Sequence, residues 1–216
     1  MAAMTWTTLT AEKTVSGSIK RWVNYDKIDP EEVIAEAEDW LAMELRTTLM
    51  EAHDIIPISA GQHEVVIPDK LPRFLDPISV FLVGHNYLHY VARDEIDRIR
   101  HQNEGGEIFE SVPCGYSIIG GGLGSILLDC AADNNYQLIV TYYRRPPSLS
   151  AAQPTNIYTD HYRALFKDAL LSKAYQLPKD TNAQQLHTTL AKAWMSQKKY
   201  NDDLILRAQE QVVRVH

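Results

Sequence analysis

The chain has 216 residues, 45% of them hydrophobic and 23% charged, with a formal net charge of −7. This is the composition of an ordinary soluble globular protein of one domain or two small ones, and the acidic balance argues against a basic surface for nucleic acid. With no signal peptide, no stretch of the roughly 20 apolar residues of a membrane span, and only two cysteines, we expect a soluble protein made in the cytoplasm with reduced thiols.

The N-terminal fifty residues predict two helices. The first covers residues 10–23, where apolar side chains recur at helical spacing although Gly17 interrupts them. The second covers residues 29–49, because Asp29 can cap the free backbone N–H groups and Pro30 suits the first helical position. The short connection between them predicts antiparallel neighbours. The apolar stripe of the second helix is Val33, Ile34, Ala37, Trp40, Leu41, Leu45 and Leu49. The acidic residues expected on its surface are Glu36, Glu38 and Asp39.

The middle of the chain changes to short apolar runs separated by prolines and glycines. Four prolines exclude a long helix between residues 55 and 80. Two apolar runs around a cluster of glycines predict a β-hairpin over residues 116–128. A short charged helix is expected over residues 93–100 and a mobile loop over residues 101–110. The predicted strands, recognised by alternating or β-branched apolar residues, are 63–67, 78–83, 87–91 and 136–143.

The last third of the chain predicts helices again. One apolar stripe ends before Pro178, and Thr181 with Gln184 resembles a capping box. This box would begin a helix of about 30 residues, or roughly 45 Å. Such a length is more than a compact domain of this size needs, so we expect the helix to project toward a partner. The residues of its first half that we expect to pack in the bundle are Leu186, Leu190 and Trp194.

The order of these elements predicts an α+β fold. Helices come first, strands follow, and helices return. We expect the helices of residues 1–50 and 151–216 to form one bundle. Residues 51–150 would then form an inserted antiparallel β-sheet region.

No group of residues predicts a catalytic, cofactor or metal site. His85 and His89 are four residues apart, and His101 and Cys114 follow, but no zinc-type pair of closely spaced ligands supports a metal. The glycine run at residues 120–124 has no Lys-Ser or Lys-Thr after it and opens a strand, so it does not predict a phosphate loop. No nucleophile motif occurs.

Four segments, in this order along the chain, resemble the head-to-tail adaptor proteins of tailed bacteriophages. The resemblance extends from about Trp22 to Tyr200. The segments are Ile34–Leu41 leading to Glu44-Leu45-Arg46, Tyr116–Gly120, Tyr142–Ser150, and Thr155–Thr159 followed by Tyr162 and Leu165.

The resemblance implies a structural virion protein that is made in the host cytoplasm and is not an enzyme. Such an adaptor needs no cofactor and no membrane. It is expected to form a ring, a dodecamer, beneath the portal protein and to join the capsid vertex to a tail nozzle or tail-tube protein. DNA would leave through the central channel without specific binding.

The end of the last helix is the predicted portal interface, because apolar residues return there after a polar interruption, flanked by arginines. The alternative is that this segment folds back along its own bundle. The predicted interface residues are Leu204, Ile205, Arg207, Ala208, Gln211, Val212, Val213, Arg214 and Val215.

Two other functions remain compatible with the residues alone. One is a small-molecule enzyme whose site lies in the β region, near His85, His89 and residues 101–114. The other is a host-directed binding module of helical-bundle type.

Overall fold

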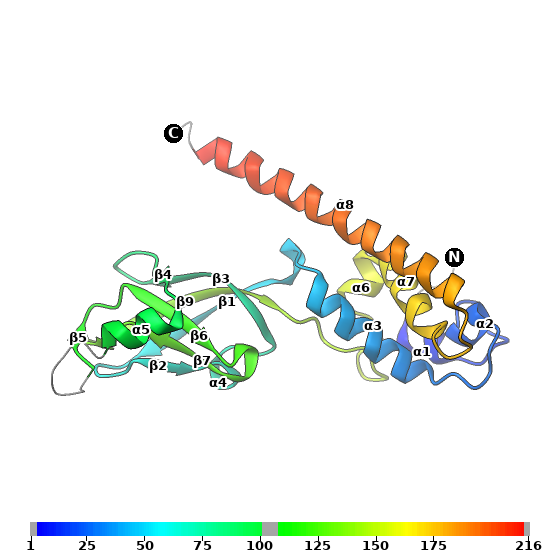
Figure 1. Ribbon diagram of the computed structural model, residues 1–216, viewed down its shortest axis with the longest axis horizontal. Coiled ribbons are helices and arrows are strands. Elements are labelled where there is room, and N and C mark those ends of the chain that lie inside the picture. The colour runs from blue at the N-terminus through cyan, green and yellow to red at the C-terminus, as the bar shows by residue number, and fades with distance from the viewer. Residues whose placement is uncertain (1–3, 101–107, 214–216) are drawn as a thin grey trace. The chain divides into compact units, whose positions relative to one another are not determined.

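The computed structural model (Figure 1) describes residues 4–100 and 108–213, with side chains described up to residue 198 in the last helix. Contacts divide the chain into a helical unit, residues 1–49 and 146–216, and a β-rich unit, residues 50–145. The predicted α+β class is confirmed. Each unit has a hydrophobic core of its own.

The helical unit begins with two short helices, α1 (Trp6–Thr10) and α2 (Ile19–Val23). The single helix predicted over residues 10–23 is therefore wrong. Gly17 adopts a φ of 99°, which a helix cannot contain and which glycine tolerates best. Ser18 follows with an extended backbone, and its hydroxyl caps α2. The glycine and the new cap end any helix that crosses this point.

Helix α3 (Pro30–Glu44) confirms the predicted cap. The Oδ1 atom of Asp29 accepts from the N–H of Glu31 at 3.0 Å, and Pro30 occupies the first turn. The helix ends before residue 49, because Leu45 adopts an extended backbone. A short 3₁₀ turn, η1 (Thr48–Met50), follows.

The later helices of this unit are α6 (Ile157–His161), α7 (Arg163–Ala174) and α8 (Thr181–Val213). Helices α2 and α3 each pack mainly on α7, so they are not the antiparallel neighbours that the sequence predicted. Core residues from both ends of the chain meet around α7. Those that are fully buried include Leu9, Ile19, Ala37, Leu41, Phe166, Ala169, Leu170 and Ala191.

A buried carboxylate ties the two ends of the chain together inside the helical unit. Glu38 of α3 was predicted on the surface, but it is only 4% exposed. Its Oε1 atom accepts from the backbone N–H of Leu149 at 3.1 Å and from the Nδ2 amide of Asn156 at 2.7 Å. Asn156 in turn caps α6 in a capping box with Thr159. One carboxylate thus organises the segment that returns from the β-rich unit.

The β-rich unit contains a three-stranded antiparallel sheet in the order β1-β9-β3. Strand β9 (Tyr136–Arg144) confirms the predicted strand over residues 136–143. Strand β3 (Phe74–Leu82) is longer than predicted and contains Pro77, which an edge strand accepts because its outer N–H side needs no partner. Strand β1 (Glu51–Ile58) was not predicted.

The pairing of the other strands differs from the antiparallel sheet that the sequence predicted. A four-stranded sheet has the order β2-β7-β6-β4, and a separate pair joins β5 to β8. The β4–β6 and β5–β8 pairs are parallel, so the sheets are mixed. Residues 101–107 of the predicted loop lie outside the described residues. The remaining elements are β2 (Glu64–Val66), α4 (Ile67–Lys70), β4 (His89–Tyr90), α5 (Arg93–Arg100), β5 (Glu110–Ser111), β6 (Gly115–Ile119), η2 (Gly121–Leu123), β7 (Ser125–Leu128) and β8 (Ala131–Ala132).

The predicted hairpin is confirmed by β6 and β7, which pair antiparallel around the glycine turn η2. Gly120 adopts a φ of 68°. At Gly124 a Cβ atom would lie 1.6 Å from the carbonyl oxygen of Ile119, so only glycine closes this turn.

Tyr142 and Arg100 make hydrogen bonds beside the core of the β-rich unit. The hydroxyl of Tyr142 donates to Oδ2 of Asp54 at 2.7 Å, and burial together with this bond raises the pKa of Tyr142 to about 12. Arg100 donates to the carbonyl oxygens of Leu128 and His63 at 2.8 and 2.7 Å, which fastens the end of α5 to the sheet. Desolvation lowers the pKa of this guanidinium, which remains charged at neutral pH.

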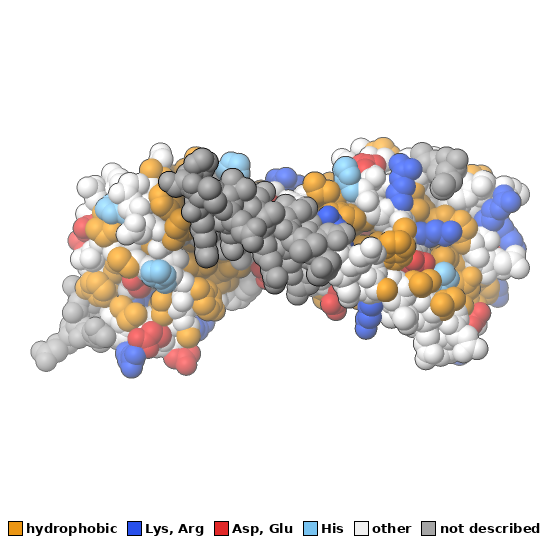
Figure 2. Space-filling model, turned by 90° about the horizontal axis from the view of Figure 1, so that it is seen from above, with side chains coloured by type: hydrophobic (Ala, Val, Ile, Leu, Met, Phe, Trp, Pro, Cys, Tyr) orange, Lys and Arg blue, Asp and Glu red, His pale blue; other side chains and the backbone are white. Residues whose placement is uncertain are grey.

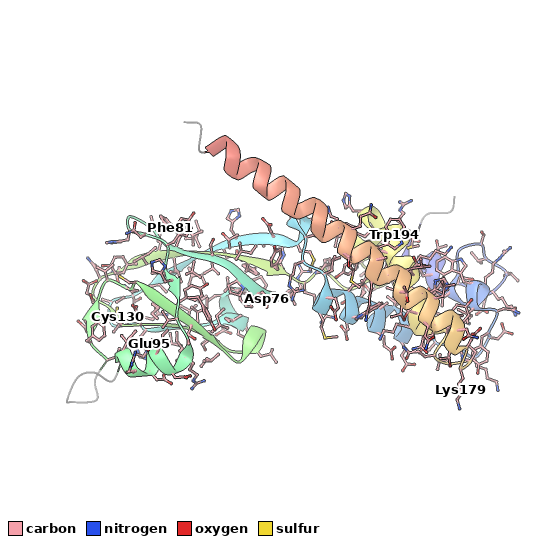
Figure 3. All side chains as sticks on the ribbon, turned by 45° about the horizontal axis from the view of Figure 1, so that its top comes forward. Asp76, Phe81, Glu95, Cys130, Lys179 and Trp194 are labelled. Carbon is pink, nitrogen blue, oxygen red and sulfur yellow. The ribbon has the colours of Figure 1, made fainter. Side chains whose placement is uncertain are left out.

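The two thiols have different surroundings. Cys114 is exposed, whereas Cys130 (labelled in Figure 3) is buried and its Sγ atom lies 3.3 Å from the carbonyl oxygen of Ser111. Burial, with a further contribution from the carboxylate of Asp129, raises the pKa of the Cys130 thiol to about 12. The thiolate is the reactive form of cysteine, so Cys130 should be unreactive while the protein is folded.

Loss of the buried carboxylate should weaken the helical unit. We expect Glu38→Ala to lower the free energy of unfolding by about 3 kcal/mol, because the Leu149 N–H and the Asn156 amide lose a buried acceptor. All four tryptophans lie in the helical unit, so urea unfolding followed by tryptophan fluorescence reports on this unit alone. The control Glu36→Ala, at an exposed site on the same helix, should change stability by less than about 0.5 kcal/mol. Equal effects of the two substitutions would contradict this role of Glu38.

Thiol labelling tests the environment of the cysteines. With N-ethylmaleimide at pH 8, the native protein should take up one label, at Cys114, and the protein in guanidinium chloride should take up two. Cys114→Ser should abolish the native reaction. Intact-mass measurement follows both labels, and rapid native labelling of Cys130 would show that its thiol is accessible.

Candidate functional site

Helix α8 has 33 residues and is therefore about 50 Å long, as its sequence predicted. It begins at Thr181, but the predicted capping box of Thr181 and Gln184 is wrong. The Oδ1 atom of Asp180 accepts from the N–H of Ala183 at 3.1 Å, so Asp180 provides the cap.

Polar contacts hold the first half of α8 against α7. Asp168 of α7 binds two side chains of α8, with Oδ1 2.9 Å from Nδ1 of His187 and Oδ2 accepting from Nε1 of Trp194 at 3.2 Å. One turn along α7, Ser172 bonds to Thr188 at 2.6 Å. Such directional bonds fix the rotation of α8 about its own axis as well as its position.

This rotation leaves apolar side chains in solvent. The helix buries Ala191 and Met195 against the core, whereas Leu186 is 57% exposed, Leu190 39% and Trp194 43%. The prediction that Leu186, Leu190 and Trp194 pack inside the bundle is therefore wrong. Figure 3 labels Trp194 on α8. We call these three residues the α8 stripe; their spacing of four places them along one side of the helix.

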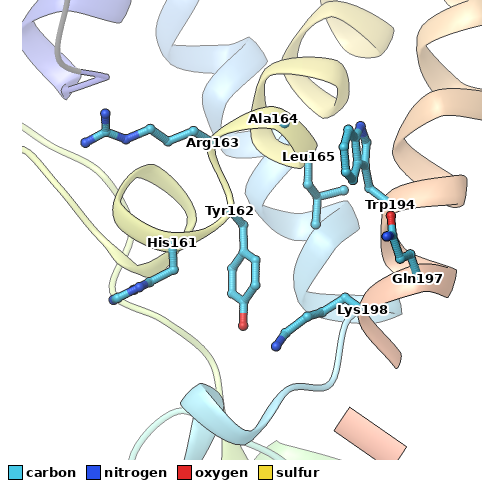
Figure 4. A pocket seen from close by; sticks show the side chains of 8 residues that line it. All are labelled: His161, Tyr162, Arg163, Ala164, Leu165, Trp194, Gln197 and Lys198. Atoms are coloured by element: carbon cyan, nitrogen blue, oxygen red, sulfur yellow. The ribbon is translucent and has the colours of Figure 1, made fainter. Parts of the chain in front are cut away.

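A pocket of about 350 Å³ opens beside Trp194 (Figure 4), between the α6–α7 junction and α8. Leu165 and the indole give it apolar walls. The buried hydroxyl of Tyr162 has no hydrogen-bond partner among the side chains that the structure describes, and Nζ of Lys198 lies 5.7 Å from the centre of the Tyr162 ring. The residues that line the pocket are His161, Tyr162, Arg163, Ala164, Leu165, Trp194, Gln197 and Lys198.

The pocket can receive an apolar side chain, and its basic residues favour an acidic neighbour. Tyr162 offers a hydroxyl, and His161, Arg163 and Lys198 offer positive charge or N–H donors. The eight lining residues include no serine, cysteine or carboxylate, so they supply no nucleophile–base pair of the kind that hydrolases use. This arrangement suits binding to a protein surface.

The residues considered as metal ligands do not form a cluster of three in the described part of the chain, although strand pairing brings His89 next to Cys114. The His85 ring packs edge-on against Tyr136 with 5.3 Å between centroids, and the N–H of His89 donates to the carbonyl of Cys114 at 2.9 Å. His101 lies outside the described residues. Where side chains are described, no three His, Cys, Asp or Glu residues gather as metal ligands.

The predicted portal interface lies at the far end of α8. The backbone is helical up to Val213, but the side chains of residues 199–213 are not described, and Arg214 and Val215 lie outside the described residues. The assignment of this segment to the portal stays a prediction.

Removal of the carboxylate at residue 168 should loosen α8. We expect Asp168→Ala to lower the free energy of unfolding by about 2 kcal/mol, because two donors on α8 lose their half-buried acceptor. Amide hydrogen exchange should quicken over residues 184–195 and leave α3 unchanged. Gln185→Ala, on the exposed side of α8, is the control. Unchanged exchange over α8 would show that Asp168 does not hold the helix.

In the described part of the chain, no helix combines the length and apolar character of a membrane span. A comparison with curated proteins returned no match. The family model described as SU10 adaptor protein matches residues 6–214, which is nearly the whole chain. The chain therefore belongs to the SU10 adaptor protein family, a family of phage head-to-tail adaptor proteins, and the resemblance drawn from its sequence is confirmed.

Proposed function

We propose that this phage structural protein forms a ring, a dodecamer, below the portal and joins the capsid vertex to the tail nozzle or tail-tube protein. Its partners are then the portal, the tail protein and further copies of this chain. DNA passes through the ring without specific binding, and the protein acts in the virion without catalysis.

The length of α8 carries this proposal. Helix α7, on which α8 packs, has 12 residues and can cover only about 18 Å of a 50 Å helix. The apolar residues that begin at Leu204 follow the polar residues Lys199, Asn201, Asp202 and Asp203. Helix α8 is longer than the helix on which it packs, and its sequence is apolar again near its end. Such a helix is suited to contact another protein.

The charges support a channel that does not retain DNA. Between residues 50 and 145 the sequence holds 13 Asp and Glu against 7 Lys and Arg. Lysine and arginine bind phosphate by releasing counterions, and a channel lined with them would hold the DNA. A channel with a predominantly acidic or neutral lining lets the DNA pass.

We also propose that the helical bundle and the β insertion, predicted from the sequence as residues 1–50 with 151–216 and residues 51–150, act as two domains of the subunit, with the boundary after Arg145 because Leu149 belongs to the helical core. Their separate cores support this division. The helical domain presents α8 to the portal.

Truncation tests the portal contact. Deletion of residues 204–216 should leave the protein folded, because the last described core residue is Met195. The truncated protein should lose attachment to purified portal particles of the same phage. A control with Asn201, Asp202 and Asp203 changed to serine keeps the length and the apolar segment and should still attach.

Circular dichroism checks folding, and co-sedimentation followed by electron microscopy checks attachment and ring formation. Normal attachment of the truncated protein, or its unfolding, would contradict the assignment of residues 204–216 to the portal.

A further inference from the structure

Helix α3 presents an acidic face to solvent. Glu32, Glu36, Asp39 and Met43 follow one another at intervals of four, three and four residues, so they share one side of the helix. All four are exposed, and Met43 is 71% exposed. We call them the α3 face. Met43 is a flexible, polarisable apolar anchor. The three carboxylates precede it along the helix, and the Arg46 guanidinium, which donates to the carbonyl oxygens of Ala42 and Met43, lies beside it.

On α8, apolar side chains lie beside basic ones. The α8 stripe is apolar, and the pocket at its end is bordered by His161, Arg163 and Lys198. On the helical unit, Figure 2 shows hydrophobic side chains and Lys or Arg side chains next to one another. The two helices thus offer an acidic surface with a protruding apolar group and a basic-edged apolar surface with a pocket.

Both surfaces are exposed parts of helices that belong to one bundle. Helices α3 and α8 both pack on α7. Ala37 and Leu41 of α3, and Ala191 and Met195 of α8, are buried toward the core. The exposed Met43 lies on the other side of α3, and Leu186 and Leu190 lie away from the buried side of α8, whereas Trp194 is half-exposed and stays bonded to Asp168 of α7.

We propose that these surfaces form one lateral contact between copies of this chain, in which the α3 face of one subunit packs on the α8 stripe and pocket of the next. This rests on the ring proposed above and identifies its subunit interface. Two different patches on one molecule make a heterologous contact, which is the kind that closes into a ring.

Charge selects this pairing over the alternatives. Two α3 faces would bring carboxylates together, and two pocket edges would bring Arg163 and Lys198 together, so like surfaces repel. The unlike pairing places Glu36 against Arg163 at the basic edge of the pocket. Met43 then fills the apolar space between Leu165 and Trp194 and covers the indole of Trp194, which a monomer leaves partly in water.

Cross-linking tests the pairing directly. In a Cys114→Ser background, which removes the exposed thiol, Met43→Cys and Gln197→Cys each introduce one exposed thiol. The proteins are assembled on portal particles of the same phage and treated with a short bis-maleimide. A mixture of the two single variants should give a linked dimer. The double variant should give a ladder that extends to the closed ring.

The results separate this inference from the proposed function. Rings on the portal without a link between residues 43 and 197 would overturn the inference and leave the adaptor role intact. A linked dimer from either single variant alone would show a two-fold contact and would also overturn it. Failure to form rings on the portal would contradict the proposed function, and the inference with it.

Charge exchange gives an independent measurement. Glu36→Arg and Arg163→Glu should each raise the protein concentration needed for half-maximal ring formation by about tenfold, which corresponds to 1.4 kcal/mol per contact. The double variant should recover most of the loss, because the pair is reversed. Asp69→Arg, the same kind of charge change on the β-rich unit, should have little effect. A double variant no better than the single ones would contradict the contact between these faces.

Discussion

The carboxylate of Glu38 is the constraint on which the helical unit depends. The chain leaves this unit after α3 and returns to it at residue 146, so something must fix where the returning segment begins. Glu38 does this from inside the core by accepting from the Leu149 backbone and the Asn156 side chain. Asn156 then sets the first turn of α6, and α7 follows in place for α3 to pack on it. Burying a carboxylate is unfavourable unless its oxygens accept hydrogen bonds. The helical unit is therefore stable only when Leu149 and Asn156 lie where they can donate to Glu38.

Polar side chains also determine the orientation of α8. A helix held only by leucines could rotate until its apolar side was covered. Asp168 and Ser172 prevent this, because their bonds to His187, Trp194 and Thr188 have one correct geometry. The helix is thus held in an orientation that its own hydrophobic residues would not choose in isolation. Polar contacts define the exposed surface here, and the exposed surface is what an adaptor offers to its neighbours.

The sequence predicted elements whose signals are local. The cap at Asp29 and Pro30, strand β9, the glycine hairpin and the length of α8 all follow from residues next to one another in the chain. Strand β1 was missed because Pro57 and its alternating polar residues conceal an edge strand. The orientation of Trp194 was predicted wrongly because its partner, Asp168, lies 26 residues away. Glu38 was assigned to the surface because its partners, Leu149 and Asn156, are even farther away in the sequence. No pattern in the residues next to Glu38 indicates that its carboxylate is buried.

The insertion of one unit inside the other sets an order for folding during synthesis. The β-rich unit is complete in sequence at Arg145, when only α1, α2 and α3 of the helical unit have been made. Those three helices then lack α7, so their apolar sides stay uncovered until the ribosome has added the C-terminal third. The β-rich unit can form as soon as it leaves the ribosome, whereas the helical core must wait for contacts between the two ends of the chain, which are costly in loop entropy and slow to form. A folded insertion shortens that search, because it brings residues 49 and 146, which flank it, to fixed positions.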